Sequence, residues 1–420
     1  MPLKKLAVDM QPGFASQPTT SDLGVPQLRT NNVSAEGRLD LSELKYVPAL
    51  PSDIERYSLM AGDILFNNTN SPALVGKTAF FRESGQFLFS NHMTRIRIDQ
   101  ALAEPRYVAR FLHWTWSQGA FRPFVTQWVN QAAINRAQLA AVPVPLPALS
   151  EQRHIVEILD QADCLRCLRA GADAKAESIL PAIFFKMFGD PVTNPKGWRE
   201  SPIDRVADVQ GGLQLSEKRK GNIDVPYLRV ANVYRNRLDL SEIKTLSVTQ
   251  PELDRTRLTA GDVLVVEGHG NPAEIGRCAV WDGSIDPCVH QNHLIRARPN
   301  PSRLRPYFLS RFLNSAAGRQ HLLRCGKTTS GLNTITVSNV KSAVIFLPPV
   351  DLQQRFEEGV ACEDTTCKLR NVASAALERL WNLLLDRAFS GSLTARWRES
   401  HMKELLTEME HQSRALAEVR

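Results

Sequence analysis

The sequence lacks any uninterrupted apolar run near the length of about 18 residues that a membrane-spanning helix needs. No apolar run follows the basic start, Met1 to Lys5, so we expect no signal peptide. Cysteine is scarce, at seven residues, and its odd count and irregular spacing do not fit a disulfide framework. We therefore expect reduced thiols and a cytoplasmic protein that does not enter a membrane.

The sequence also lacks a strong excess of either positive or negative charge, with 51 Lys and Arg residues against 44 Asp and Glu residues. The formal net charge is +7, a modest basic bias that is compatible with nucleic-acid binding and does not prove it. Hydrophobic residues make up 43% of the 420 residues, which is enough for well-packed cores in about two to four domains.

An internal repeat runs through most of the chain. Residues 38–43 (RLDLSE) recur at 237–242, about 200 residues later, and residues 59–66 recur in pattern at 258–265. Both copies of the latter segment contain Gly-Asp, which predicts a tight turn into a buried strand. Asn91-His92 and Asn292-His293 each precede an alternating strand. The sequence therefore predicts two copies of one fold.

Each copy is closed by a long helix. Residues 142–147 contain three prolines and must be extended, after which Ser150 is expected to cap a helix starting at Glu151. Apolar residues then recur at heptad spacing, which is typical of a helix that packs along another helix, and Pro181 is expected to kink or restart it. A similar entry, with Gln353-Gln354 in place of Glu151-Gln152, leads into a second long helix that ends near Gly391.

The polar loops differ between the two copies. Residues 67–71 face 267–271 in the sequence comparison, and 127–131 face 328–332. These loops are rich in side chains that can pair with base edges, and they lack paired carboxylates for acid–base chemistry. Neutral drift of the loops is the alternative. The expected DNA contacts are Arg29, Asn31, Asn32, Asn67, Asn68, Asn70, Lys77, Asn91, His92, Gln127, Asn130, Gln131, Arg229, Asn232, Arg235, His269, Asn271, Arg277, Gln291, Asn292, His293, Lys327, Thr328, Thr329 and Asn333.

This arrangement resembles the specificity subunit of type I DNA restriction–modification systems, from about residue 6 to residue 391. The most diagnostic segment is residues 145–152 (PLPALSEQ), followed by the closing Phe389-Ser390-Gly391. The resemblance implies that each copy is a target recognition domain reading one half of a split, asymmetric double-stranded DNA site. It further implies that antiparallel helices set the spacing and dock two methyltransferase subunits, to which restriction–translocase subunits are added.

The predicted fold class is α+β, with two tandem recognition domains and two long antiparallel coiled-coil helices related by a pseudo-two-fold repeat. The expected boundaries are 1–148 and 191–348 for the recognition domains, 149–190 and 349–395 for the helices, and 396–420 for an amphipathic tail. We expect no catalytic residue, cofactor or metal. A stand-alone DNA-binding or scaffold protein is the first alternative, and a single-chain enzyme acting on nucleic acid is the second.

Rival motifs are weak. Cys164 and Cys167 with Cys362 and Cys367 suggest a four-cysteine zinc site, but antiparallel helices would place the pairs roughly 10–15 Å apart along the axis. Gly326-Lys327 lacks the earlier glycine of a phosphate-binding loop, since His321 stands there. The residues Trp114, Trp116 and Trp128 are expected to pack in the core or against helices.

The tetrapeptide Trp198-Arg199-Glu200-Ser201 recurs at residues 397–400. We expect the second copy to supply a piece that the N-terminus lacks, with residues near Leu6 and Trp397 in contact. After it, Met402, Leu405, Met409, Leu416 and Val419 form an apolar seam of a short amphipathic helix, with Gln412 as a polar break.

Overall fold

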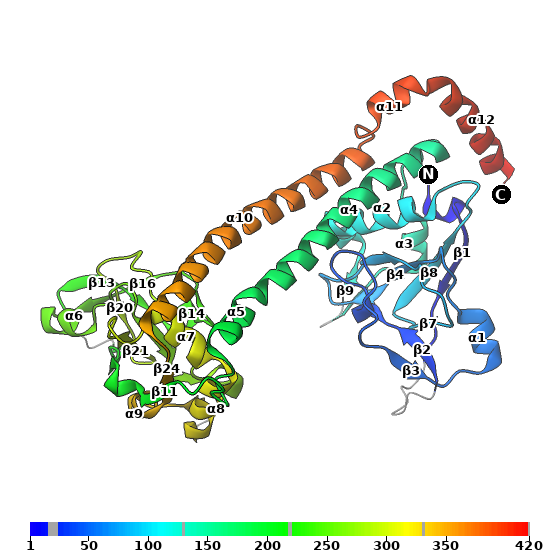
Figure 1. Cartoon of the computed structure of the whole chain (residues 1–420). Coiled ribbons are helices and arrows are strands. Elements are labelled where there is room, and N and C mark those ends of the chain that lie inside the picture. The colour runs from blue at the N-terminus through cyan, green and yellow to red at the C-terminus, as the bar shows by residue number, and fades with distance from the viewer. Residues whose placement is uncertain (16–23, 128–130, 217–220, 330–331, 419–420) are drawn as a thin grey trace. The chain divides into compact units, whose positions relative to one another are not determined.

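The computed structural model describes residues 1–15, 24–127, 131–216, 221–329 and 332–418, and the chain divides into two compact units. Unit 1 comprises Met1–Arg169 and Ser374–Arg420, and unit 2 comprises Ala170–Ala373. Both ends of the chain therefore belong to unit 1, and both unit boundaries fall within the long helices (Figure 1).

In unit 1 a four-stranded antiparallel sheet has the order β1-β8-β4-β6, and two three-stranded sheets have the orders β3-β2-β7 and β5-β10-β9. The strands are β1 (Ala7–Pro12), β2 (Val25–Leu28), β3 (Lys45–Val47), β4 (Ile64–Asn67), β5 (Thr69–Asn70), β6 (Thr78–Phe80), β7 (Leu88–Phe89), β8 (Met93–Ile98), β9 (Thr126–Gln127) and β10 (Ala132–Ala133).

Unit 2 repeats these sheets in the same orders, as β12-β21-β17-β19, β16-β13-β20 and β18-β23-β22, and it adds the pairs β11-β24 and β14-β15. Its strands are β11 (Arg199–Pro202), β12 (Ala207–Gly211), β13 (Ile223–Leu228), β14 (Val233–Tyr234), β15 (Arg237–Leu238), β16 (Lys244–Val248), β17 (Val263–Val266), β18 (Gly268–His269), β19 (Cys278–Val280), β20 (Val289–His290), β21 (Leu294–Pro299), β22 (Lys327–Thr329), β23 (Leu332–Thr334) and β24 (Val344–Leu347). The matching topology confirms the predicted internal repeat.

The helices are α1 (Pro51–Tyr57), α2 (Pro105–Ser117), α3 (Arg136–Ala140), α4 (Leu149–Glu177), α5 (Ile179–Phe188), α6 (Gln250–Thr256), α7 (Pro306–Asn314), α8 (Ala316–Cys325), α9 (Val337–Ser342), α10 (Val350–Phe389), α11 (Ala395–Ser400) and α12 (Met402–Glu418). Helices α1, α2 and α3 of unit 1 correspond to α6, α7 and α9 of unit 2, whereas in the part of the chain that the structure describes α8 occurs only in unit 2 and α11 and α12 only in unit 1. In unit 1 the apolar face of α2 packs between the central sheet and α4, and Tyr107 of α2 is 1% exposed. In unit 2 the corresponding core contains Phe308 of α7, packed against Phe184 and Phe188 of α5.

The helices α4 and α10 pair in antiparallel orientation. In unit 1, Arg166 binds Glu378 through two nitrogen–oxygen pairs of 2.8 Å, and one turn along α4 the Arg169 guanidinium donates to Ser374. In unit 2, Arg370 forms an ion pair with Asp173. The expected restart is also present, because α4 ends at Glu177 and α5 begins at Ile179, which places Pro181 in the first turn of α5, where a missing N–H is tolerated.

The expectation that Ser150 caps the first long helix is wrong. The helix α4 begins at Leu149, and the Gln152 N–H already donates to the carbonyl of Ala148. The N–H of Ser150 donates instead to the Glu408 carboxylate of α12 at 3.1 Å. A side chain distant in sequence therefore satisfies one of the free N–H groups that every helix start exposes.

The two long helices share a glutamine, and its position corrects the sequence comparison. Gln152 donates to the Pro147 carbonyl at 2.8 Å, and Gln353 makes the same bond to Pro348. Gln152 therefore corresponds to Gln353, not Gln354, and Glu151 corresponds to Leu352. Both glutamines are 0% exposed.

The Gly-Asp turns are confirmed in both units. Gly62 and Gly261 have φ values of 103° and 93°, a region that favours glycine. The next residue, Asp63 or Asp262, is buried and bound by an arginine of the neighbouring strand. In unit 1 this is Arg97, whose Nε and Nη2 lie 2.7 and 2.9 Å from the carboxylate oxygens and whose pKa is raised by that hydrogen bond.

The tail is helical, as predicted, and its buried face follows the predicted seam only in part: Leu405 and Leu416 pack inward, and Val419 lies outside the described residues. Leu405 is 3% exposed and Gln412 is 8% exposed, whereas Met402 and Met409 are 44% and 48% exposed. Gln412 is not a break, since its Nε2 donates to the Leu102 carbonyl at 2.6 Å. A free loop carbonyl on the opposing surface makes a buried glutamine favourable there.

The repeated tetrapeptide takes two conformations, and the expectation that its second copy completes unit 1 is wrong. In unit 2, residues 199–202 form β11, paired with β24. In unit 1 the equivalent place is filled by Met1 to Leu3, since the Met1 amine and the Leu3 N–H donate to the carbonyls of Val144 and Val142. Residues 397–400 are helical instead, and Trp397 stacks on His154.

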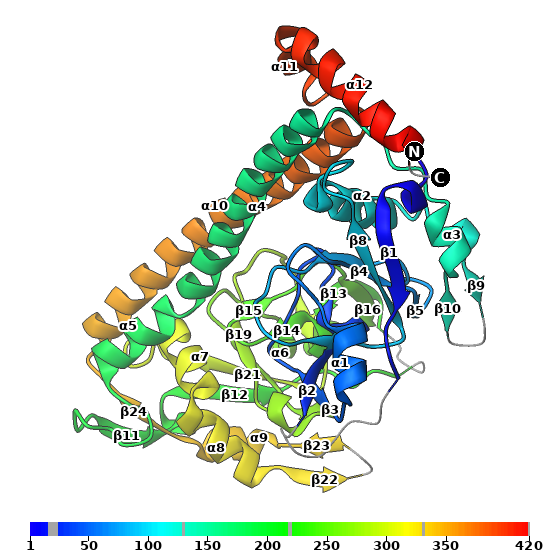
Figure 2. The same cartoon turned by 90° about the vertical axis from the view of Figure 1, so that its right-hand side faces the viewer.

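The two ends of the chain nevertheless meet in unit 1, through α12. Ala415 and Leu416 of α12 pack against the hydrophobic cluster that contains Leu6. Both views show the end of α12 close to the N-terminus (Figures 1 and 2).

Candidate nucleic-acid interface

The two loops that differ most between the repeats form one small sheet in each unit. In unit 1 the first loop contributes β5, and the second contributes β9 and β10, so the sheet β5-β10-β9 joins them. In unit 2 the sheet β18-β23-β22 joins the equivalent loops. Figure 2 shows β5, β9 and β10 together, beside the central sheet of unit 1. Each unit thus carries its divergent polar segments on one surface of a shared scaffold.

In each unit one residue hydrogen-bonds through its backbone to both the Asn-His loop and the segment directly after β10 or β23. In unit 1 the Asn68 N–H donates to the His92 carbonyl at 3.1 Å, and the Asn68 carbonyl accepts from the Ile134 N–H at 2.9 Å. In unit 2 the Glu267 N–H donates to the His293 carbonyl at 2.9 Å, and its carbonyl accepts from Ile335 at 2.8 Å. We call Asn68 and Glu267 the junction residues. The sequence comparison placed Asn67 opposite Glu267, so it was shifted by one residue.

Two of the predicted DNA contacts are internal clamps. Asn32 is 2% exposed, accepts from the Arg29 N–H at 2.9 Å, and donates to the carbonyls of Asp40 and Glu43. Asn232 makes the same three hydrogen bonds in unit 2. Because their polar groups are already paired inside the loop, we remove both from the proposed DNA-contacting set.

Other predicted contacts are also buried. Lys77 is 7% exposed and its Nζ donates to the Val33 carbonyl, and burial lowers the pKa of this amine. Its counterpart Arg277 is equally buried and binds the Val230 carbonyl and Glu274. Asn67, at 0% exposure, donates to the Thr30 carbonyl, and Gln291 is 7% exposed. These side chains support the fold beneath the surface and leave the proposed set as well.

Fourteen of the remaining predicted contacts have accessible side chains. Exposed ones are Asn31, Asn91, His92, Gln131, Asn271 and His293. Partly exposed ones are Arg29, Asn68, Asn70, Arg229, Arg235, His269, Asn292 and Asn333. Asn130, and the side chains of Gln127, Lys327, Thr328 and Thr329, lie outside the described part of the structure.

The contacts of His293, Trp114 and Trp116 show how these side chains are used in the fold. His293 lies 3.3 Å from a Glu267 carboxylate oxygen. The Trp114 ring packs at a tilt against Phe389 and its indole N–H donates to Asp386, which confirms a packing role, and Trp116 donates to the Ala73 carbonyl. Trp128 lies outside the described residues.

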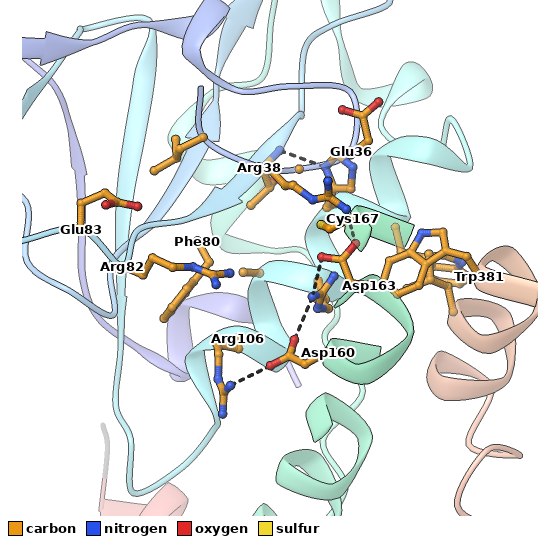
Figure 3. Close-up of a pocket in the computed structure, with 18 residues that line it drawn as sticks. Glu36, Arg38, Phe80, Arg82, Glu83, Arg106, Asp160, Asp163, Cys167 and Trp381 are labelled. Carbon is orange, nitrogen blue, oxygen red and sulfur yellow. Dashed lines mark hydrogen bonds and ion pairs between the residues drawn. The ribbon is translucent and has the colours of Figure 1, made fainter. Parts of the chain in front are cut away.

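A pocket of about 270 Å³ lies within unit 1, between the recognition domain and the helices α4 and α10 (Figure 3). The charged groups on its α2 and α4 sides pair with each other: Arg106 and Arg110 of α2 each lie 2.8 Å from an oxygen of Asp160, and Arg38 binds Asp163. The guanidinium of Arg110 also lies 5.2 Å from the centroid of the Trp381 ring. These contacts hold the recognition domain on α4. Charges that are already paired in this way offer little to a ligand, so the pocket is not assigned a binding role.

The described residues contain neither a cluster of metal ligands nor a membrane-spanning helix. No three His, Cys, Asp or Glu side chains of the described residues are grouped as metal ligands. The seven cysteines are free, and Cys164, Cys167 and Cys362 are exposed. None of the helices within the described ranges is long and apolar enough to cross a bilayer.

Comparison with known proteins matches this architecture. The family described as the type I restriction modification DNA specificity domain matches residues 19–169 and 195–361. The EcoKI specificity subunit of Escherichia coli K12 is 28% identical over 400 residues, covering 89% of this chain and 83% of that protein. The putative MjaX specificity subunit of Methanocaldococcus jannaschii is 23% identical, covering 93% and 92%.

Solved structures agree on the fold. A chain from a type I restriction–modification system, studied for its assembly and conformational transition, has a TM-score of 0.60 at 18% identity and covers 94% of this chain and 97% of its own length. The S subunit from M. genitalium has a TM-score of 0.52 at 11% identity, covering 93% and 95%. The chain belongs to the type I restriction–modification DNA specificity family and is a non-catalytic specificity subunit.

The site also contains Glu267, which is not among the contacts expected from the sequence. Glu267 lies within a divergent loop, but the expected contacts are amide, hydroxyl, histidine and cationic side chains. The sequence feature that could have indicated Glu267 is its position directly after the strand Val263–Val266. That position points to a role in the site only once the two repeats are aligned in three dimensions.

Proposed function

We propose that units 1 and 2 each read one half of a bipartite, asymmetric site on double-stranded DNA. The observation that carries this proposal is the repeated small sheet, which gathers the two divergent loops of each unit onto a common scaffold. Identical scaffolds with different polar loops suit two readers of two sequences, because direct readout depends on which donors and acceptors reach the base edges.

The long helices would set the distance between the half-sites. Helix α10 has 40 residues, and a helix of that length spans about 60 Å at 1.5 Å per residue, enough to bridge more than one turn of duplex. Exposed apolar side chains along the pair, such as Leu165 and Leu168, would help to dock two methyltransferase subunits. Restriction–translocase subunits would join through that core, and the free cysteines suit the cytoplasm.

The test is a domain exchange. Residues 1–148 would be replaced by the equivalent segment of a relative, and the chain would be assembled with its methyltransferase partner. Long-read sequencing of methylated DNA should then show one half-site changed and the other retained. A change in both half-sites, or methylation without a bipartite site, would contradict the proposal.

A further inference from the structure

The junction residues differ in chemistry although their backbones make the same hydrogen bonds. In unit 1 the Asn68 side chain is held by two hydroxyls of its own unit. Its Nδ2 donates to Thr69 Oγ1 at 3.1 Å, and its Oδ1 accepts from Thr94 Oγ1 at 3.2 Å. The amide is thus largely satisfied before any ligand arrives.

Unit 2 lacks both hydroxyls at the equivalent places. Strand pairing aligns Thr69 with Gly268 and Thr94 with Ile295, neither of which has a side-chain hydroxyl. The Glu267 carboxylate is instead approached by His293, whose Nδ1 lies 3.3 Å from Oε2. The side chains of Glu267 and His293 are 26% and 56% exposed. This pair lies at the surface, beside the sheet formed by the divergent loops.

Resting on the DNA-reading function proposed above, we propose that Glu267, oriented by His293, determines base specificity at one position of the half-site read by unit 2. A carboxylate only accepts hydrogen bonds, so it pairs in the major groove with the exocyclic N4 amino group of cytosine, whereas adenine sets the N7 acceptor beside its amino group. It repels the carbonyl oxygens of guanine O6 and thymine O4, and its charge is unfavourable near phosphates unless a base donor compensates. The imidazole engages Oε2 at 3.3 Å, and Oε1 would then accept from the base.

A purely structural ion pair is the competing explanation. Exposed pairs of this kind contribute little to stability. The connection between the loops is made by the backbone N–H and carbonyl of Glu267. Asn68 makes the same backbone hydrogen bonds in unit 1 although its side chain is an amide. A structural role therefore does not require a carboxylate at this position.

The experiment uses the full chain assembled with its methyltransferase partners and a library of duplexes with both half-sites randomised, at fixed salt. Glu267→Gln keeps the shape of the side chain and adds donors, and His293→Ala removes the orienting group. Glu200→Gln, which removes an exposed carboxylate elsewhere in unit 2, controls for the change in net charge. Asn68→Glu transfers the carboxylate to unit 1.

The wild-type complex should prefer cytosine at one position. Glu267→Gln should weaken that preference over guanine and thymine by about tenfold or more, with His293→Ala weakening it less. Glu200→Gln should leave it unchanged, and Asn68→Glu should alter only the other half-site. Thermal unfolding of each variant should match the wild type.

Two failures can be told apart. If Glu267→Gln keeps the wild-type base preference, or raises binding to all sequences equally, the inference about Glu267 is wrong while bipartite reading stands. If the wild-type complex shows no bipartite preference at all, the proposed function itself is overturned, and the inference with it.

Discussion

The side-chain oxygen of Gln152, at the start of α4, accepts a hydrogen bond of 2.9 Å from the backbone N–H of Glu104, the residue that caps α2. Its amide nitrogen donates to Pro147, so one buried side chain fastens the recognition domain to its long helix. In unit 2, Gln353 accepts from the Arg305 N–H at 2.8 Å in the same way. The second residue of the Glu-Gln motif is thus the one that both repeats require.

We predict that Gln152→Ala lowers the free energy of unfolding of unit 1 by about 1–3 kcal/mol, because it leaves a buried N–H and a buried carbonyl unpaired. Hydrogen exchange of peptides from α2 and α4 measures this. Gln353→Ala should act on unit 2, whereas Gln354→Ala, at an exposed neighbouring position, should change little. Equal effects from Gln353 and Gln354 would restore the alignment made from sequence.

The buried Gly-Asp carboxylate gives a second prediction. Asp63→Asn should destabilise unit 1 by about 1.5–3 kcal/mol, because it removes a charge-assisted hydrogen bond to the partly exposed guanidinium of Arg97. Chemical denaturation of the full chain, followed in unit 1 by hydrogen exchange, checks it. Asp40→Asn, at an exposed loop position, is the control, and a matching loss there would argue against the buried pair.

His290 predicts an acid sensitivity of unit 2. Burial, helped by the charge of Arg296, lowers its pKa to about 4, below the ordinary value of about 6.5. The folded state favours the neutral ring, so its stabilising effect is present above pH 6.5 and is lost as the pH falls toward 4. Between pH 7 and pH 5 the loss should be roughly 2 kcal/mol. His290→Phe, the residue that Phe89 supplies in unit 1, should remove this part of the pH dependence in hydrogen-exchange profiles. An unchanged profile would contradict it.

The tail gives a fourth prediction. Arg398 donates to the Glu151 carboxylate at 2.8 and 3.0 Å, and Thr394 donates to the same oxygen. Arg398→Ala should release α11 and α12 and increase exchange in unit 1, because it leaves the 3% exposed Glu151 without its cation. Arg396→Ala, at an exposed position in the same helix, is the matched control. Unaltered protection of α12 in Arg398→Ala would show that its apolar face alone holds the tail.

Much of the architecture could be predicted from local patterns. The repeat, the Gly-Asp turns and the two long helices can be recognised from short segments, because the conformation of each segment depends on neighbours a few residues away. Two copies of one pattern in a single chain also test each other, and this made the two-domain α+β prediction firm. The divergent loops were found the same way, as places where two copies of one scaffold stop agreeing.

The roles of individual polar residues were decided by the tertiary structure. Asn32 and Lys77 have side chains of the kind that contact DNA. In the folded chain, however, they bind carbonyls of residues that are distant in sequence. Ser150 is a residue type that commonly caps helices, but here its N–H donates to the carboxylate of Glu408, which comes from the C-terminal helix. The sequence determined which segments form strands and helices, because those preferences are local. Which side chains remain at the surface to read a ligand depends on hydrogen bonds between distant segments, and only the tertiary structure decided that.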